Sequence, residues 1–235
     1  MKLHRIDLYE DDLGFVEMVD CMGTDLTIVN SARVSFGKEK DEIDEKDQNL
    51  IKYLVKNKHT STFEHNVITF RMKVPLFIRS QHMRHRTWSY NEISRRYTEQ
   101  NLEFYEPKSF RIQSQSNRQA SDDQHINPVI KTSQVGEGSS ASYLVRSHHI
   151  ASLKLYDLLI GSGVCREQAR GVLPQNLYTE YYGTVNLSNL LKFIDLRTHA
   201  GAQSEIRQLA LAMLEIAKKQ WPLAVDSYQA NRREK

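Results

Sequence analysis

The segment of residues 84–97, RHRTWSYNEISRRY, holds the side chains with the clearest capacity for chemistry. Four arginines and His85 surround a single carboxylate, Glu92. Cationic side chains this close together repel one another unless an anion or solvent lies among them. A guanidinium group binds phosphate, or a carbonyl together with a ring nitrogen, through paired hydrogen bonds that lysine cannot make. The segment therefore predicts a site for an anionic ligand.

Two other interpretations of this segment stay open. A solvated basic loop is the first, but such loops favour lysine, and this segment contains none. The second is a nucleic-acid-binding module in which Trp88, Tyr90 and Tyr97 stack on bases. The formal net charge of only +3 argues against a general polyanion-binding surface, so we expect no nucleic-acid partner.

Length and composition predict one sizeable globular domain over residues 1–235, or at most two small ones. With 40% hydrophobic residues, the chain can bury a sizeable core. No run approaches the roughly 18 apolar residues that span a bilayer, and the N-terminus lacks the apolar region of a signal peptide. We therefore expect a soluble, cytoplasmic protein with no membrane partner. Cys21 and Cys165 form no CxxC pair, which predicts neither a zinc ribbon nor a disulfide framework.

Metal and dinucleotide motifs are weak or missing. His82 and His85 have the spacing of a metal-binding pair, but the cations of Arg84 and Arg86 beside His85 oppose metal binding, so we expect no metal. The sequence contains no P-loop and no GxGxxG, and therefore no Rossmann-type dinucleotide site.

Flanking elements must bring the arginine-rich segment to its ligand. Apolar residues repeat with helical spacing over residues 44–57, and residues 67–74 alternate as a strand does. Pro75 ends that strand and suits the first turn of a helix that carries Gln81. The arginine-rich segment thus begins where a helix ends and a loop opens. Upstream, we expect a short strand at 15–19 and a helix with Asp25 as its N-cap.

The second half of the chain begins with a change of composition. Residues 111–142 carry too few apolar side chains to order themselves independently, and we interpret them as a polar insertion or lid, partly mobile. A long core helix is predicted from residue 143 to the glycines at 161–163, with His148 and His149 at its surface.

Shorter elements then complete the chain. We expect a helix at 166–171, a strand at 178–185, a helix that Asn186 caps and that ends near Arg197, a last helix at 206–217, and a frayed tail at 231–235. The predicted fold class is α+β, a helix-rich single domain with a small antiparallel sheet.

The order Arg84-His85-Arg86 with a following Ser94 closely resembles the signature of the flavin-dependent thymidylate synthases. Further similar stretches cover nearly the whole chain: VEMVDCMGTDLTIVNSARVSF, HTSTFEH, PLFIRSQHMRHR, LEFYEP, ARGVLPQNLYT, and LR followed by AQSEI. The resemblance implies the fold of that family and a homotetramer whose sites are shared between subunits. It also implies reductive methylation of dUMP to dTMP, with methylenetetrahydrofolate as carbon donor, FAD as hydride donor and NADPH as the source of electrons.

Matched position by position, the resemblance implies two sets of contacts. FAD would meet Ser61, Arg84, His85, Arg86, Glu92 and, from another subunit, Asn186. The nucleotide dUMP would meet Gln81, Arg84, Glu92, Ser94, Arg95, Arg96, Arg170 and Arg197. Arg197 would be the catalytic group. With no cysteine nucleophile to push electrons into the uracil ring, a guanidinium beside the ring can stabilise the negative charge that develops on it.

This chain departs from the pattern of the family at three positions. Arg95 stands where glycine is common, Lys192 where an asparagine contact to flavin is common, and Thr62 where proline is frequent. On the helix after Cys165, spacing alone leaves Arg166 and Arg170 as alternatives, and the resemblance selects Arg170.

Overall fold

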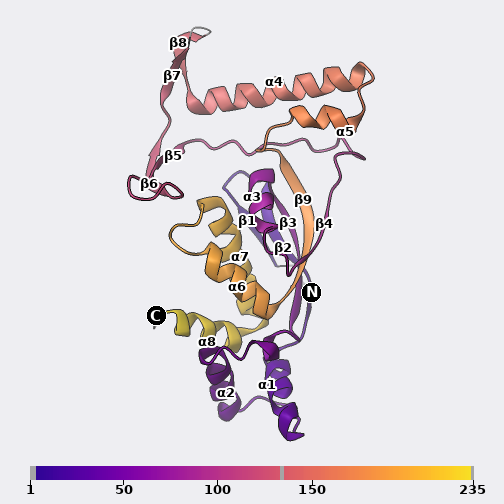
Figure 1. Ribbon diagram of the computed structural model, residues 1–235, viewed down its shortest axis with the longest axis vertical. Helices are drawn as coiled ribbons and strands as arrows, with labels where there is room; N and C mark the ends of the chain where they lie inside the picture. Colours follow the sequence, from indigo (N-terminus) through magenta and orange to yellow (C-terminus); the bar gives the residue numbers. More distant parts are fainter. Residues whose placement is uncertain (1–3, 133–134, 234–235) are drawn as a thin grey trace.

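The computed structural model describes residues 4–132 and 135–233. Its centre is a five-stranded sheet of order β1-β2-β3-β9-β4, in which every neighbouring pair is antiparallel (Figure 1). The strands are β1 (Arg5–Leu8), β2 (Gly14–Met22), β3 (Val67–Pro75), β4 (Ser89–Glu92) and β9 (Tyr178–Asn186). The predicted helix-rich α+β fold with a small antiparallel sheet is confirmed. The edge strands β1 and β4 were not predicted.

One face of the sheet carries the core. The helices that pack on it are α3 (Leu76–His82), α6 (Leu187–Arg197) and α7 (Ser204–Gln220) (Figure 1). Along β3, Ile68, Phe70 and Met72 are fully buried, because alternate side chains of a strand point to the same face. The other face is polar at the centre, where the hydroxyl oxygens of Thr69 and Thr184 lie 2.9 Å apart.

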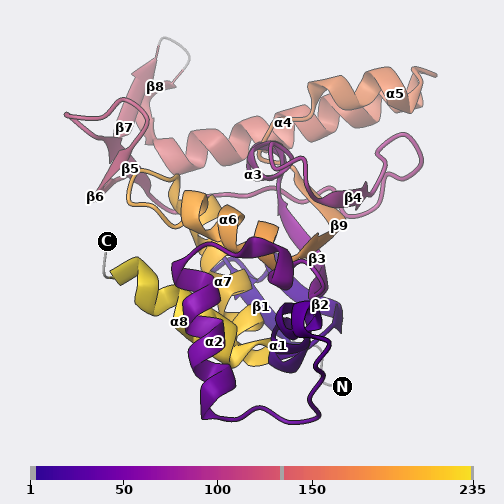
Figure 2. The same cartoon turned by 60° about the horizontal axis from the view of Figure 1, so that its bottom comes forward.

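A second group of helices packs together below the sheet in Figure 1 and comes forward in Figure 2. It consists of α1 (Asp25–Arg33), α2 (Glu45–Lys56) and α8 (Pro222–Arg233). The prediction of Asp25 as the N-cap of α1 was wrong, because Thr24 occupies that position. The Asp25 carboxylate instead accepts hydrogen bonds from the amides of Leu223 and Ala224, each at 3.0 Å, and so caps α8.

Helix α8 also corrects the expected frayed tail. Residues 231–233 belong to α8, and residues 234–235 lie outside the described residues. The buried side chains of Trp221, Val225 and Tyr228 hold this last helix against the domain, and the sequence analysis did not weigh them.

The polar segment 111–142 forms two hairpins. β5 (Phe110–Gln113) pairs with β6 (Ser121–Ile126), and β7 (Val129–Thr132) pairs with β8 (Val135–Ser140). We expected too little order here, because we judged the segment by its apolar content, whereas strands pair through backbone groups that every residue except proline supplies. The role of the segment as a lid stays a prediction.

Helix α4 (Ala141–Gly161) lies above the sheet, next to the hairpins (Figure 1). It is not the core helix that its apolar content predicted, because Tyr143, Ile150 and Leu158 are exposed in the single chain. The prediction of two surface histidines is wrong for His149. Its ring is buried, stacks on Phe104 at 4.7 Å, and has Nδ1 3.1 Å from a Glu106 carboxylate oxygen. His148 is exposed, as predicted.

The described residues contain no cluster of three or more histidine, cysteine, aspartate or glutamate side chains that could hold a metal ion. Within the same residues, no helix is long and apolar enough to cross a membrane.

Asp47 is a buried carboxylate on which the loop before α2 depends. Arg33 Nε donates to Asp47 Oδ1 at 3.0 Å, Lys40 Nζ to Asp47 Oδ2 at 2.5 Å, and the Asp44 amide to Asp47 Oδ2 at 3.1 Å. Burial by itself raises the pKa of Asp47, but the hydrogen bonds from Lys40, Asp44 and Arg33 outweigh burial and hold the pKa below its ordinary value.

We expect Asp47→Asn to lower the free energy of unfolding by about 1.5 to 3 kcal/mol near neutral pH, the range for hydrogen bonds to a charged group. Because the folded-state pKa is lowered, the carboxylate contributes fully above the unfolded pKa of about 4, and this contribution is lost as the pH falls below that value. Denaturant titrations of both proteins across this pH range measure the effect. The matched control is Asp41→Asn, at an exposed position of the same loop, and an Asp47→Asn variant as stable as this control would contradict the prediction.

Candidate active site

Arg197, the last residue of α6, meets the end of α3. Its Nε donates to His85 Nε2 at 3.1 Å, and its Nη2 donates to the backbone carbonyl of Gln81 at 3.1 Å. Its Nη1 lies 3.5 Å from the side-chain oxygen of Gln81. The structure therefore brings together three of the residues that the sequence analysis selected, although they come from two helices and one loop.

His85 accepts a hydrogen bond here because its imidazole is neutral. Burial and, to a lesser extent, the positive charge of Arg197 together lower the pKa of His85 to about 4. At neutral pH the ring thus offers a lone pair at Nε2. Arg197 keeps its charge because a guanidinium is not deprotonated in proteins, even though burial lowers its pKa. The described residues place no carboxylate in an ion pair with Arg197.

Glu92 ends strand β4 and is held from two sides. Thr179 Oγ1 donates to Glu92 Oε1 at 2.7 Å, and Arg79 Nε donates to Glu92 Oε2 at 2.9 Å. The sequence analysis selected neither Thr179 nor Arg79. The one available signal was the place of Arg79 on the same short helix as Gln81. These contacts fix the carboxylate that the sequence analysis placed between flavin and nucleotide.

The other arginines of the segment differ in their surroundings. The guanidinium of Arg95 donates to the backbone carbonyls of Gln100, Asn101 and Tyr178, so this side chain holds the fold. Arg96 is exposed and pairs with Glu167 at 3.0 Å, while its amide lies 3.3 Å from Ser94 Oγ. Arg84 and Arg86 are exposed at the turn before β4.

Three predicted residues make no hydrogen bond or ion pair with Gln81 or Arg197 among the described residues. Arg170 is exposed at the start of η3 (Arg170–Val172), which follows α5 (Arg166–Ala169) and packs beside α4. Ser61 is exposed in η2 (Thr60–Phe63). Asn186 caps α6, with its side-chain oxygen accepting from the Asn189 amide at 2.9 Å, as predicted for the N-cap.

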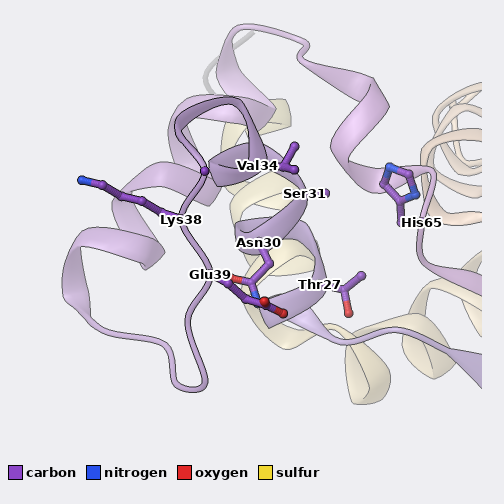
Figure 3. Close-up of a pocket in the computed structure, with 8 residues that line it drawn as sticks. Thr27, Asn30, Ser31, Val34, Lys38, Glu39 and His65 are labelled. Carbon is purple, nitrogen blue, oxygen red and sulfur yellow. The ribbon is translucent and has the colours of Figure 1, made fainter.

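Two pockets lie along segments that carried the family resemblance. A pocket of about 690 Å³ is lined by α1, the following loop and His65; Figure 3 shows Lys38 pointing away from α1. A smaller pocket of about 270 Å³ has Lys192 of α6 in its lining together with His59 and Thr60. The chain thus places Lys192, one of its departures from the family pattern, opposite the HTSTFEH segment.

His82, the last residue of α3, follows Gln81 and is fully buried. Its Nδ1 is 2.8 Å from the hydroxyl of Tyr181, and its ring packs against Trp88 and Phe193 at 4.4 and 4.8 Å between centroids. Burial lowers the pKa of His82 to about 3, with smaller effects of His85 and Arg197. His82 is therefore a neutral residue of the core.

Comparison with known proteins assigns this chain to a family. The family described as thymidylate synthase complementing protein matches residues 17–223. The flavin-dependent thymidylate synthase of Thermus thermophilus is 44% identical over 218 residues, which are 93% of this chain and 76% of that protein. This chain belongs to the flavin-dependent thymidylate synthase family. The resemblance drawn from the arginine-rich segment is confirmed.

Other relatives extend the match. The flavin-dependent thymidylate synthase of Thermosipho melanesiensis is 40% identical over 217 residues, covering 92% of this chain and 91% of that protein. A solved structure of the UMP/dUMP methylase PolB from Streptomyces cacaoi, bound with 5-Br dUMP, has a TM-score of 0.77 at 33% identity and covers 96% of this chain and 97% of that chain. The fold of this flavin-dependent thymidylate synthase family member is therefore that of a solved relative.

We expect His82 to make stability depend on pH. Its folded-state pKa lies below the unfolded value of about 6.5, so the unfolded chain takes up the proton first and stability falls as the pH falls below that value. Between about pH 8 and about pH 5 this costs about 2 kcal/mol. Denaturant titrations should show a shallower pH dependence for His82→Phe than for the wild type. Equal slopes for the two proteins would show that His82 is protonated, or exposed, in the folded state.

Proposed function

We propose that this protein carries out the reductive methylation of dUMP to dTMP, with methylenetetrahydrofolate as carbon donor and NADPH as reductant. FAD, when bound, supplies the hydride. Membership of the family supports this assignment, as does the solved relative, whose title names a UMP/dUMP methylase bound with a brominated dUMP. The observation that carries it is the half-buried Arg197 guanidinium, held by Gln81 and His85 without a carboxylate partner among the described residues.

Arg197 is the group proposed to activate the nucleotide. Negative charge must develop on the uracil ring when its carbon is alkylated and reduced, and a fixed cation beside a ring carbonyl stabilises that charge. The contacts to Gln81 and His85 orient the guanidinium without neutralising it, because both partners are uncharged. Its charge therefore remains available to a substrate.

The cysteines support a mechanism without a thiolate nucleophile. Burial raises the pKa of Cys21 to about 11, with the neighbouring Asp20 adding to the shift, which is the opposite of thiolate activation. Cys165 is exposed before α5, and its Sγ lies 3.7 Å from the side-chain oxygen of Gln168. Neither is in hydrogen-bond contact with Arg197.

The residues proposed to hold FAD fit an anionic cofactor. Arg84 and Arg86 are exposed guanidinium groups next to the neutral His85, and such groups bind pyrophosphate oxygens. Ser61 and Asn186 lie on other parts of the surface. A homotetramer would join these parts across subunits, and it would also bring Arg170 to a nucleotide bound at Arg197.

The alternative of a nucleic-acid module loses its support. Trp88 is buried and packs on Phe70 and Phe193, and Tyr90 stacks on Trp88 at 6.1 Å. Their faces are therefore occupied by the core and do not form a platform for bases. Of the three aromatic side chains first considered, Tyr97 alone is largely exposed.

We expect the purified protein to take up FAD, to show a flavin absorption spectrum that NADPH bleaches, and to form dTMP from dUMP only with methylenetetrahydrofolate present. Flavin content, anaerobic reduction and product analysis measure the three parts, and mass determination in solution tests the tetramer. A protein that binds no FAD, and instead binds single-stranded nucleic acid with steep salt dependence, would favour the alternative.

Replacement of Arg197 by alanine should lower dTMP formation at saturating dUMP by roughly 10² to 10³, the usual effect of losing one preorganised electrostatic group. Flavin content and reduction by NADPH should change little. Arg197→Lys should restore only part of the rate, because an ammonium lacks the paired donors of a guanidinium. Arg5→Ala, at an exposed arginine of β1, serves as the control. Normal turnover in a folded Arg197→Ala protein would assign the activating role to another arginine.

A further inference from the structure

The polar hairpin segment is tied to the domain by one buried ion pair. Arg111, on β5, donates from Nη2 to both carboxylate oxygens of Glu205 at 2.8 and 2.9 Å. Glu205 lies in the first turn of α7, is 4% exposed, and also accepts from the Tyr105 hydroxyl at 3.2 Å. Figure 2 shows the connection from α6 to α7 beside β5. A buried ion pair with several hydrogen bonds has one arrangement of low energy.

From Glu205 a chain of hydrogen bonds leads to Arg197. Gln203 Nε2 donates to Glu205 Oε2 at 3.0 Å, and Gln81 Nε2 donates to Gln203 Oε1 at 2.5 Å. The remaining oxygen of the Gln81 side chain faces Arg197 Nη1 at 3.5 Å. The hairpin segment and the arginine of the proposed nucleotide site are thus connected through two amide side chains.

The chemistry of the two ends gives this chain a direction. An ionised carboxylate only accepts hydrogen bonds, and a guanidinium only donates them. Gln203 must therefore turn its NH₂ group to Glu205 and its oxygen to Gln81. Gln81 must in turn offer its NH₂ group to Gln203 and its oxygen to Arg197. Rotating either amide by half a turn would bring two donors or two acceptors together.

We propose that Arg111 and Glu205 are positioning residues for the nucleotide site and that they act through Gln203. Together they fix the orientation of the Gln81 amide and, through it, of the Arg197 guanidinium. This inference rests on the proposed role of Gln81 and Arg197 in binding dUMP. It assigns to the hairpin segment a part in the geometry of the site, in addition to any role as a lid.

Arg111 is needed because Glu205 is buried. Burial alone raises the pKa of Glu205, but the hydrogen bonds and charge of Arg111, together with hydrogen bonds from the backbone and Gln203, outweigh burial and bring the pKa below its ordinary value. Without Arg111, the protonated form of Glu205 becomes favoured at a higher pH. A protonated carboxyl can donate as well as accept, so Gln203 would lose its single orientation.

Three variants test this chain of hydrogen bonds at different points. Gln203→Leu interrupts the hydrogen bonds without changing the Arg111–Glu205 pair. Arg111→Gln removes the positive charge at position 111, and Arg111→Lys keeps a positive charge there. We expect Gln203→Leu and Arg111→Gln to lower kcat/KM for dUMP about tenfold, the scale of one hydrogen bond to a charged partner. Arg111→Lys should recover most of the loss. Flavin content and NADPH-dependent flavin reduction should match the wild type. The control is Lys131→Ala, at an exposed residue of the same segment on β7.

Two further measurements separate positioning from simple support of the fold. The double variant Arg111→Gln with Gln203→Leu should have a kcat/KM no lower than that of the less active single variant, because both changes interrupt the same chain of hydrogen bonds. For Arg111→Gln alone, the acid limb of the activity profile should move to higher pH, since Arg111 then no longer offsets the effect of burial on the pKa of Glu205. Additive losses, an unmoved acid limb, or kcat/KM of Gln203→Leu within twofold of the wild type would overturn the proposal.

A crystal structure of Gln203→Leu gives a readout that does not depend on turnover. It should show the Gln81 amide or the Arg197 guanidinium displaced or in two conformers, while the Arg111–Glu205 pair is kept. Unchanged Gln81 and Arg197 side chains would refute the positioning role, whatever the activity. A wild-type protein that forms no dTMP would refute the proposed function, and this structure would still decide the question of orientation.

Discussion

A guanidinium withdrawn from water must find acceptors, and much of this structure follows from how Arg197 finds them. Its partners are a carbonyl at the end of α3, the Gln81 side chain and the lone pair of a neutral imidazole. None of these partners carries a charge, so the cation is held in place and stays available. Meeting this requirement brings the end of α6, the end of α3 and the following loop to one point, and the central sheet supports all three.

The same constraint explains why the site includes neutral histidines beside so many arginines. His82 and His85 are kept uncharged by burial and by the cation next to them, so neither adds to the repulsion. The carboxylates are distributed in a complementary way. Glu92 is held by Arg79, and Glu205 is held by Arg111, so each of these two carboxylates has its own arginine. Arg197, by contrast, pairs with no carboxylate among the described residues and is held by uncharged groups.

Most of the sheet and helices could be predicted from the sequence, because β3, α2 and α6 have clear apolar periodicity that tertiary packing reinforces. The predictions that failed concern residues whose environment depends on distant segments. Asp25 looked like the cap of its own helix but caps α8, and His149 looked solvated but packs under Phe104. In the site, the family resemblance selected Gln81, His85 and Arg197. Arg79, Thr179 and Glu205 lie in stretches that resemble the family, but the sequence did not show which partners they contact. Spacing in a sequence carries no record of such contacts.

The order of strands has a consequence for how the protein is made. β9 lies between β3 and β4, and the paired hydroxyls of Thr69 and Thr184 are separated by 115 residues along the chain. Contacts between such distant residues form late, because a long loop must close before they provide any stabilisation. On the ribosome, β3 therefore emerges with an unpaired edge well before β9 is synthesised. During that interval the nascent chain presents backbone donors and acceptors that other chains can bind, so crowding and slow elongation after β3 should favour aggregation of the growing polypeptide.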